Sequence, residues 1–244
     1  MSYSQYLSVF NQCADLIGES VGVHQGRGFS GQRDTQYHLD LAADEVGLAV
    51  LQAAGLAIMS EESGITGEGD LVVVIDPIDG STNCDRSIPI FSTSLGLLHH
   101  GELVMGFVRH HGTGQTYHAI RGEGAFRDGQ RISTSGAVAM SDAIVAFSGW
   151  PNKHIGWSQH RALGSAAIEL CLVADGSLDM FAVTSESKLH PWDYLGGMLI
   201  AQEAGAVVAE YDGLELVLAQ AVPRRIVAAA TASLADEVLA HGIL

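Results

Sequence analysis

Hydrophobic residues follow a helical period at two places in the first quarter of the chain. Apolar side chains recur at helical spacing from Tyr6 to Ile17, which predicts an amphipathic helix near the amino terminus. A second helix is expected over residues 39–54, where Gly55 ends it. The intervening residues 24–36 are polar and rich in glycine, which is typical of a mobile loop, and we expect this segment to act as a lid.

Apolar runs of strand length dominate the middle of the chain. Residues 71–75 are all apolar and mostly β-branched, which predicts a strand buried on both faces that stops at Asp76-Pro77. Polar turns separate the next predicted strands, which indicates an antiparallel meander. These strands span residues 91–98, 103–109 and 115–120. The first half of the chain is therefore predicted to be α+β.

Strands and helices alternate in the second half, which predicts an α/β arrangement. The strands are expected at residues 144–147, 178–183, 206–210 and 226–230, and the helices at residues 165–174, 192–204 and 234–240. No proline-rich or serine-rich linker separates the halves. We therefore expect residues 1–140 and 141–244 to pack as one compact unit.

The charge balance of the chain is strongly acidic. Its 244 residues include 28 Asp and Glu but only 12 Lys and Arg, for a net charge of −16. This charge argues against nucleic acid or an anionic membrane as a partner, and it favours a cation. The three cysteines are widely spaced, which predicts reduced thiols in a cytoplasmic protein. Neither a signal peptide nor a membrane span is expected.

The motif with the clearest chemistry is VVVIDPIDGSTN, residues 72–83. Asp76, Asp79 and the Ile78 carbonyl offer three oxygen ligands within four residues, as a hard cation requires. The following Gly80–Asn83 segment predicts a helix start, where free N–H groups attract phosphate. The same residue types are also common in turns that bind no ligand. In that alternative, Asp76-Pro77 would only end a strand and Ser81 would only cap a helix.

Several further motifs resemble those of the inositol monophosphatase family, whose wider group includes fructose-1,6-bisphosphatase and phosphoadenosine phosphatase. They are Glu61-Glu62-Ser63-Gly64, Pro191-Trp192-Asp193-Tyr194, Gly196-Gly197 and Glu203-Ala204-Gly205. The resemblance runs from about residue 39 to the end of the chain. It implies a layered α-β-α-β-α sandwich, a Mg²⁺-dependent phosphomonoesterase and a homodimer.

The resemblance also implies a set of metal ligands. Glu61, Asp76 and the Ile78 carbonyl match ligands of a first Mg²⁺, and Asp76, Asp79 and Asp193 match ligands of a second. Two or three ions per subunit are expected. Glu62 is expected to support the site without binding a cation.

A hydroxyl and an acid are implied to activate the attacking water. Ser81 occupies the hydroxyl position and Asp44 the acid position. Two departures accompany this match: Leu41 stands where relatives commonly have threonine, and Arg33 is nearest to the position of a common lysine.

The resemblance places the substrate on the residues Asp79, Gly80, Ser81, Ser165, Ala166 and Glu186. Glu186 and the short chain favour a monophosphate of inositol or a similar polyol, hydrolysed by direct attack of water without a phospho-enzyme. Alternative substrates are a phosphoadenosine nucleotide, fructose 1,6-bisphosphate, histidinol phosphate and an aminocyclitol phosphate. A non-catalytic regulator that binds metal or phosphate is the alternative outside the enzyme class.

Overall fold

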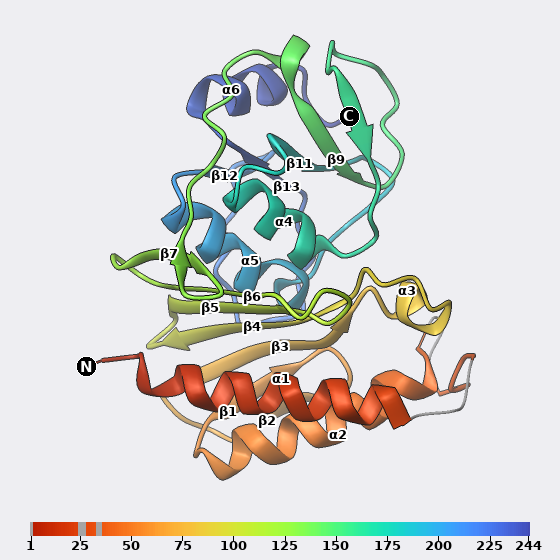
Figure 1. The fold of residues 1–244 in the computed structure, drawn as a ribbon, viewed down its shortest axis with the longest axis vertical. Coiled ribbons are helices and arrows are strands. Elements are labelled where there is room, and N and C mark those ends of the chain that lie inside the picture. Colours follow the sequence, from red (N-terminus) through yellow and green to blue (C-terminus); the bar gives the residue numbers. More distant parts are fainter. Residues whose placement is uncertain (1, 24–27, 33–35) are drawn as a thin grey trace.

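A computed structural model describes residues 2–23, 28–32 and 36–244, and these residues form five layers (Figure 1). The first layer holds α1 (Gln5–Val23) and α2 (His38–Ala53), and the middle layer holds α4 (Ala166–Ala174) and α5 (Pro191–Glu203). A large sheet separates these layers, and a small sheet lies between the middle layer and α6 (Ala232–Ala240). The predicted α-β-α-β-α sandwich is confirmed. None of the described helices is long and apolar enough to cross a membrane.

The large sheet has eight strands in the order β2-β1-β3-β4-β5-β6-β7-β8. They are β1 (Ala57–Ser60), β2 (Gly64–Thr66), β3 (Leu71–Asp79), β4 (Ser92–His99), β5 (Glu102–His110), β6 (Thr116–Ile120), β7 (Gly124–Arg127) and β8 (Gln130–Arg131). The predicted antiparallel meander is confirmed from β3 onward, whereas β1 lies parallel to β3. The sequence analysis did not predict the short strands β1, β2, β7 and β8.

The small sheet has the order β10-β9-β11-β13-β12. Its strands are β9 (Ile144–Ser148), β10 (Gln159–Arg161), β11 (Met180–Val183), β12 (Val207–Glu210) and β13 (Ile226–Ala229), and the short 3₁₀ helix η1 (Met140–Asp142) precedes it. The predicted alternation of strands and helices is confirmed, with β10 as an addition. β10 has the sequence QHR and is fully exposed, so no apolar pattern marks it.

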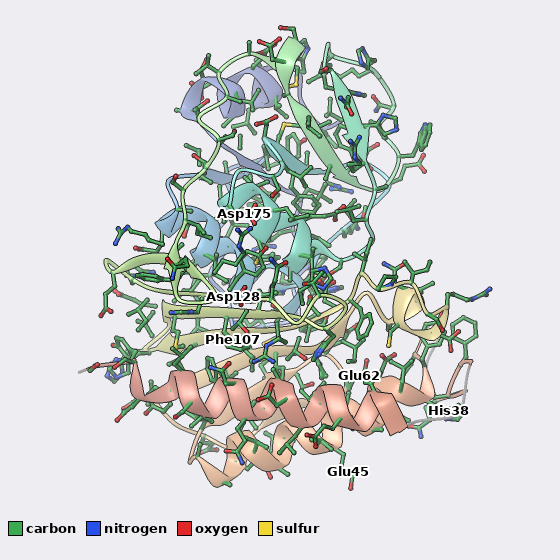
Figure 2. All side chains as sticks on the ribbon, in the orientation of Figure 1. His38, Glu45, Glu62, Phe107, Asp128 and Asp175 are labelled. Carbon is green, nitrogen blue, oxygen red and sulfur yellow. The ribbon has the colours of Figure 1, made fainter. Side chains whose placement is uncertain are left out.

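Apolar side chains fill the space between each pair of layers. Phe10 of α1 meets Phe107 of β5 edge to face at 6.0 Å between ring centroids, and Figure 2 shows Phe107 between the large sheet and α1. Leu170 and Tyr194 belong to the core that contains α4 and α5. Leu234 of α6 packs into the core that includes Val227 of the small sheet. The large sheet is therefore buried on both faces, as the apolar run of β3 predicts.

Glycines allow α5 to lie directly on the backbone of the large sheet. Gly96 of β4 is paired with Gly106 of β5, and α5 crosses the sheet at this pair with Gly196. A Cβ atom at Gly106 would lie 2.3 Å from the Gly196 carbonyl oxygen, and one at Gly196 would lie 2.8 Å from Ser94 Oγ. No larger residue fits at this contact. The contact fixes the distance between α5 and the large sheet, and Asp193 lies in the first turn of α5.

Gly106→Ala is expected to lower the free energy of unfolding by about 1–3 kcal/mol, because the methyl group must push α5 away from the sheet. Urea denaturation measures this change. Gly22→Ala is the matched control, since a Cβ at Gly22 of α1 meets no atom within 4 Å and alanine favours a helix. Equal stabilities of the Gly106 variant and the wild type would show that α5 does not need this close contact.

Candidate active site

Three carboxylates from separate parts of the chain meet at one edge of the large sheet. The strand β1 ends where Ser60 is paired to Ile75 of the parallel strand β3, so the next residues, Glu61 and Asp76, become neighbours. Asp193 joins them from the first turn of α5. One oxygen from each of the three side chains lies within 4.8 Å of the others. The sequence named all three as metal ligands, and the structure brings them together.

The electrostatics of this cluster fit a divalent cation. Burial is the main cause that raises the pKa of Glu61 to about 7 and the pKa values of Asp76 and Asp193 well above the usual range. Repulsion by nearby carboxylates, among them Asp79, raises all three further. Buried acids in this arrangement either hold protons or share a cation, and Mg²⁺ prefers carboxylate oxygens. The donor set is therefore suitable for Mg²⁺.

The segment after Asp76 does not end the strand as the sequence predicted. β3 continues to Asp79, because a bulge between Asp76 and Asp79 accommodates Pro77 and Ile78 within the strand. The Asp76 carboxylate accepts a hydrogen bond from the Ile78 backbone N–H at 2.9 Å, and the Ile78 residue is buried. The bulge thus fixes the orientation of Asp76 locally.

Asp79 connects the end of β3 to the amino terminus of α4. Its carboxylate accepts hydrogen bonds from Ser165 Oγ at 2.6 Å, from the Ala167 N–H at 2.8 Å and from the Ala166 N–H at 3.2 Å. Ser92 Oγ contributes a fourth hydrogen bond at 3.3 Å. The negative charge of Asp79 therefore interacts favourably with the positive end of the α4 dipole. The expectation that Asp79 binds a second cation stays a prediction.

The helix α3 (Ser81–Asp85) follows directly and confirms the predicted helix start. Gly80 is its N-cap residue with a φ of 92°, and a Cβ there would lie 2.9 Å from the Gly164 carbonyl oxygen. Glycine is required on both grounds. Ser81 is the first helical residue and not the cap, so the interpretation of Ser81 as only a helix cap is wrong.

The helix α2 presents two buried acids near this region. Asp44 accepts a hydrogen bond from the Ser60 hydroxyl, and no hydrogen bond between Asp44 and Ser81 occurs among the described residues. Figure 2 shows the next residue, Glu45, pointing outward from α2. The role of Asp44 in water activation therefore stays a prediction.

Asp40, one turn earlier in α2, is the acid that the sequence interpretation missed. It is buried and accepts a hydrogen bond from the Tyr37 N–H at 2.8 Å. Burial is the main cause of the raised pKa values of Glu61, Asp76 and Cys84, and the charge of Asp40 raises each of them further. Asp40 is thus near both the carboxylate cluster and Cys84 of α3. Its spacing of four residues from Asp44 places both acids on one face of the helix.

The remaining predicted residues lie around or outside the cluster. Glu62 accepts a hydrogen bond from Gln36, and its charge raises the pKa of Glu61 after the larger effect of burial. Glu186 is exposed in the loop between β11 and α5. Arg33 and most of the predicted lid lie outside the described residues.

A cavity of about 320 Å³ opens beside the cluster. Asp79, Ser165, Ala166 and Asp193 are among the residues that line it. Glu186 does not line this cavity. The predicted substrate segment of α4 is therefore next to one of the clustered carboxylates, within a volume suited to a small ligand.

Glu169 also lines this cavity and was not predicted. It is 1% exposed, accepts a hydrogen bond from the Leu163 N–H at 2.8 Å, and burial raises its pKa to about 8. A carboxyl group with a pKa of about 8 is mostly protonated at neutral pH. The signal in the sequence was a single acid within the apolar helix AAIELCLVA.

Glu169→Gln is expected to stabilise the protein relative to the wild type as pH rises from 5 to 8. The folded pKa of Glu169 lies above its unfolded value, so the wild type loses stability over this range, whereas glutamine does not titrate. The difference should grow by about 1–4 kcal/mol, as one pKa unit corresponds to roughly 1.4 kcal/mol. Urea denaturation at several pH values measures it. Exposed Glu186→Gln is the control, and an identical pH trend in both variants would contradict a buried, protonated Glu169.

Comparisons with known proteins agree with the fold and the cluster. The sequence profile of the inositol monophosphatase family matches residues 9–242. A fructose-1,6-bisphosphatase/inositol-1-monophosphatase of Archaeoglobus fulgidus is 38% identical over 182 residues, covering 72% of this chain and 71% of the relative. An inositol-1-monophosphatase of Mesorhizobium japonicum is 31% identical over 240 residues, covering 87% and 88% of the two chains.

Solved structures show the same architecture over nearly the whole chain. The extragenic suppressor protein of Bartonella henselae superposes with a TM-score of 0.83 at 25% identity, covering 97% of each chain. An IMPase of Thermotoga maritima has a TM-score of 0.81 at 26% identity, covering 97% of this chain and 96% of the other. The fold and the site define a phosphoric monoester hydrolase. The chain belongs to the inositol monophosphatase family.

Proposed function

We propose that this chain hydrolyses the phosphate ester of a small polyol, such as inositol monophosphate, with Mg²⁺ as cofactor. One observation carries the proposal: Asp193 belongs both to the carboxylate cluster and to the wall of the cavity beside it. A cation-binding group thus adjoins a space of ligand size. Membership of a family that acts on small phosphorylated substrates supports the same reaction class.

Different residues of the site have different roles in the proposed reaction. The cations, of which we propose two or three per subunit, would be held by Glu61, Asp76, Asp79, Asp193 and the Ile78 carbonyl. Mg²⁺ at such a site lowers the pKa of water and neutralises charge on the phosphate. Ser81 orients the attacking water, with Asp44 or Asp40 as the acid that polarises its hydroxyl.

Direct attack by water is favoured over a covalent phospho-enzyme. Burial raises the pKa of the Cys13 thiol to about 12 and that of Cys171 well above its usual range. A thiol of such high pKa is a poor nucleophile at neutral pH. The partly buried Cys84 also has a raised pKa, again mainly through burial.

Glu186 favours a substrate with one phosphate. Its exposed carboxylate, in the loop before α5, would repel a second phosphate brought near it. Fructose 1,6-bisphosphate is the second candidate, because the Archaeoglobus fulgidus relative is named for both activities. Glu186 is proposed to contact the polyol hydroxyls from the loop before α5.

Phosphate release from several esters tests the substrate assignment. We expect inositol 1-phosphate to have a higher kcat/KM than fructose 1,6-bisphosphate or a phosphoadenosine nucleotide. Glu186→Gln should narrow the gap by about 1–3 kcal/mol, the range for a hydrogen bond to a charged group. A wild-type preference for the bisphosphate would contradict the polyol assignment, and an unchanged ratio in the variant would remove Glu186 from the site.

We also propose that the chain forms a homodimer and is located in the cytoplasm. The homodimer rests on the family resemblance, and the location on the three free, widely spaced cysteines. Light scattering should give twice the chain mass of 25.7 kDa.

A further inference from the structure

In the bulge of β3, the backbone carbonyl of Pro77 accepts a hydrogen bond from a side chain of the neighbouring strand β4. Ser94 of β4 is paired with Asp76 and Ser92 with Asp79, so the single residue Thr93 lies opposite both Pro77 and Ile78. Thr93 is fully buried, and its hydroxyl donates a hydrogen bond to the Pro77 carbonyl at 2.9 Å. This carbonyl lies within the sequence between the cation ligands Asp76 and Ile78.

A half-buried histidine holds the Thr93 hydroxyl in turn. His111 follows β5, and its Nε2 atom lies 2.8 Å from Thr93 Oγ1. The hydroxyl has a single proton, which it gives to Pro77, so His111 must carry its proton on Nε2 and donate it to the hydroxyl oxygen. Burial is the main cause that lowers the pKa of His111 to about 4, which agrees with a neutral ring.

Two elements fix the orientation of the His111 ring. Phe91 stacks against it with ring centroids 5.5 Å apart and an interplanar angle of 22°. Gly18 of α1 lies so close that a Cβ there would be 3.0 Å from His111 Nδ1. The ring therefore has one packed position, and the line of hydrogen bonds runs from His111 through Thr93 to the Pro77 carbonyl.

We propose that Thr93 and His111 are positioning residues for the cation-binding segment Asp76–Asp79. By holding the Pro77 carbonyl they fix the bulge, and the bulge sets the direction of the Asp76 carboxylate and the Ile78 carbonyl. They contact neither substrate nor cation and act only through the backbone. The inference rests on the proposed Mg²⁺ site.

Stability alone does not separate this role from an ordinary core hydrogen bond. Thr93→Val leaves the buried Pro77 carbonyl without its partner, which lowers the melting temperature under either interpretation. Mg²⁺ affinity of the folded protein does separate them. Removal of a group that orients metal ligands through hydrogen bonds typically weakens metal affinity by about 10- to 100-fold.

Isothermal titration of Mg²⁺ into the metal-free protein, well below the melting temperature of each variant, is the test. We expect Thr93→Val to weaken Mg²⁺ binding about 10-fold and Thr93→Ser, which keeps the hydroxyl, to stay within about twofold of the wild type. His111→Phe keeps a stacked ring without the donor and should weaken binding about three- to tenfold. In the Thr93→Val background, His111→Phe should add little, because the line of hydrogen bonds is already broken.

His99→Phe is the matched control. His99 lies at the other end of β4 and has a comparable hydrogen bond of 2.8 Å to the Tyr3 hydroxyl. Its loss should change stability without changing the Mg²⁺ affinity. Variants of Thr93 and His111 that bind Mg²⁺ like the wild type would overturn the positioning role while leaving the proposed function intact. A wild type that does not bind Mg²⁺ would overturn the proposed function and this inference with it.

Discussion

Asp193→Asn is expected to abolish phosphate release while leaving the protein folded. Asp193 accepts a hydrogen bond from the His190 N–H at 2.6 Å as part of the start of α5, and the amide oxygen of asparagine can accept the same bond. The negative charge at the cluster is lost, however. Because a catalytic cation contributes several kcal/mol and 1.4 kcal/mol is tenfold in rate, kcat/KM should fall by about 10³-fold or more.

Asp179→Asn is the matched control for this variant. Asp179 also accepts a backbone hydrogen bond, from the Ile144 N–H at 2.7 Å, but it does not belong to the carboxylate cluster. Its activity should equal that of the wild type. Steady-state rates and melting curves of both variants separate charge loss from misfolding. An Asp193 variant with more than about a tenth of wild-type activity would show that this carboxylate does not serve the reaction.

Ser81→Ala is expected to lower kcat by about 10²- to 10⁴-fold with little change in KM, the range for a lost acid-base contact. Ser81 is the first residue of α3 and has no role as its N-cap, so the melting temperature should change little. Rates at saturating substrate and a melting curve measure both quantities. An alanine variant with nearly wild-type kcat would remove Ser81 from the reaction.

The acid that serves Ser81 is distinguished by a pair of variants in α2. Asp40 is electrostatically coupled to Glu61, Asp76 and Cys84, whereas Asp44 binds the Ser60 hydroxyl. We therefore expect Asp40→Asn to lower kcat more than Asp44→Asn does. In the Ser81→Ala background, the variant of the true partner should lose most of its effect. The opposite ranking would support the sequence interpretation of Asp44.

Two residues of the carboxylate cluster, which the sequence analysis expected to be metal ligands, lie at recognisable boundaries. Asp76 follows an apolar run of strand residues, and Asp193 lies in the first turn of the helix that begins at Pro191. Glu61 becomes their neighbour only because β1 lies parallel to β3, and the sequence analysis did not predict β1. The resemblance to a family, and not the local pattern, identified Glu61 before the fold was known.

Other features depend on contacts between distant segments. The hydrogen bonds of Asp79 to α4 join residues 86 to 88 positions apart. The burial of Glu169 and the pairing of Thr93 with His111 likewise arise only when the layers pack. The predicted division at residue 140 stays a prediction, as do the ligand roles of Asp79 and Ile78. The periodicity of hydrophobic residues along the sequence does not predict contacts between distant segments.

Phosphate release from inositol 1-phosphate as a function of Mg²⁺ concentration tests the central claim most directly. The acidic cluster of Glu61, Asp76 and Asp193 predicts no turnover in chelator and a saturable rise in rate as Mg²⁺ is restored. Adding Mg²⁺ back after chelation should recover the full rate. Turnover in chelator equal to that with Mg²⁺ would contradict the account, because the clustered carboxylates would then have no cation to hold.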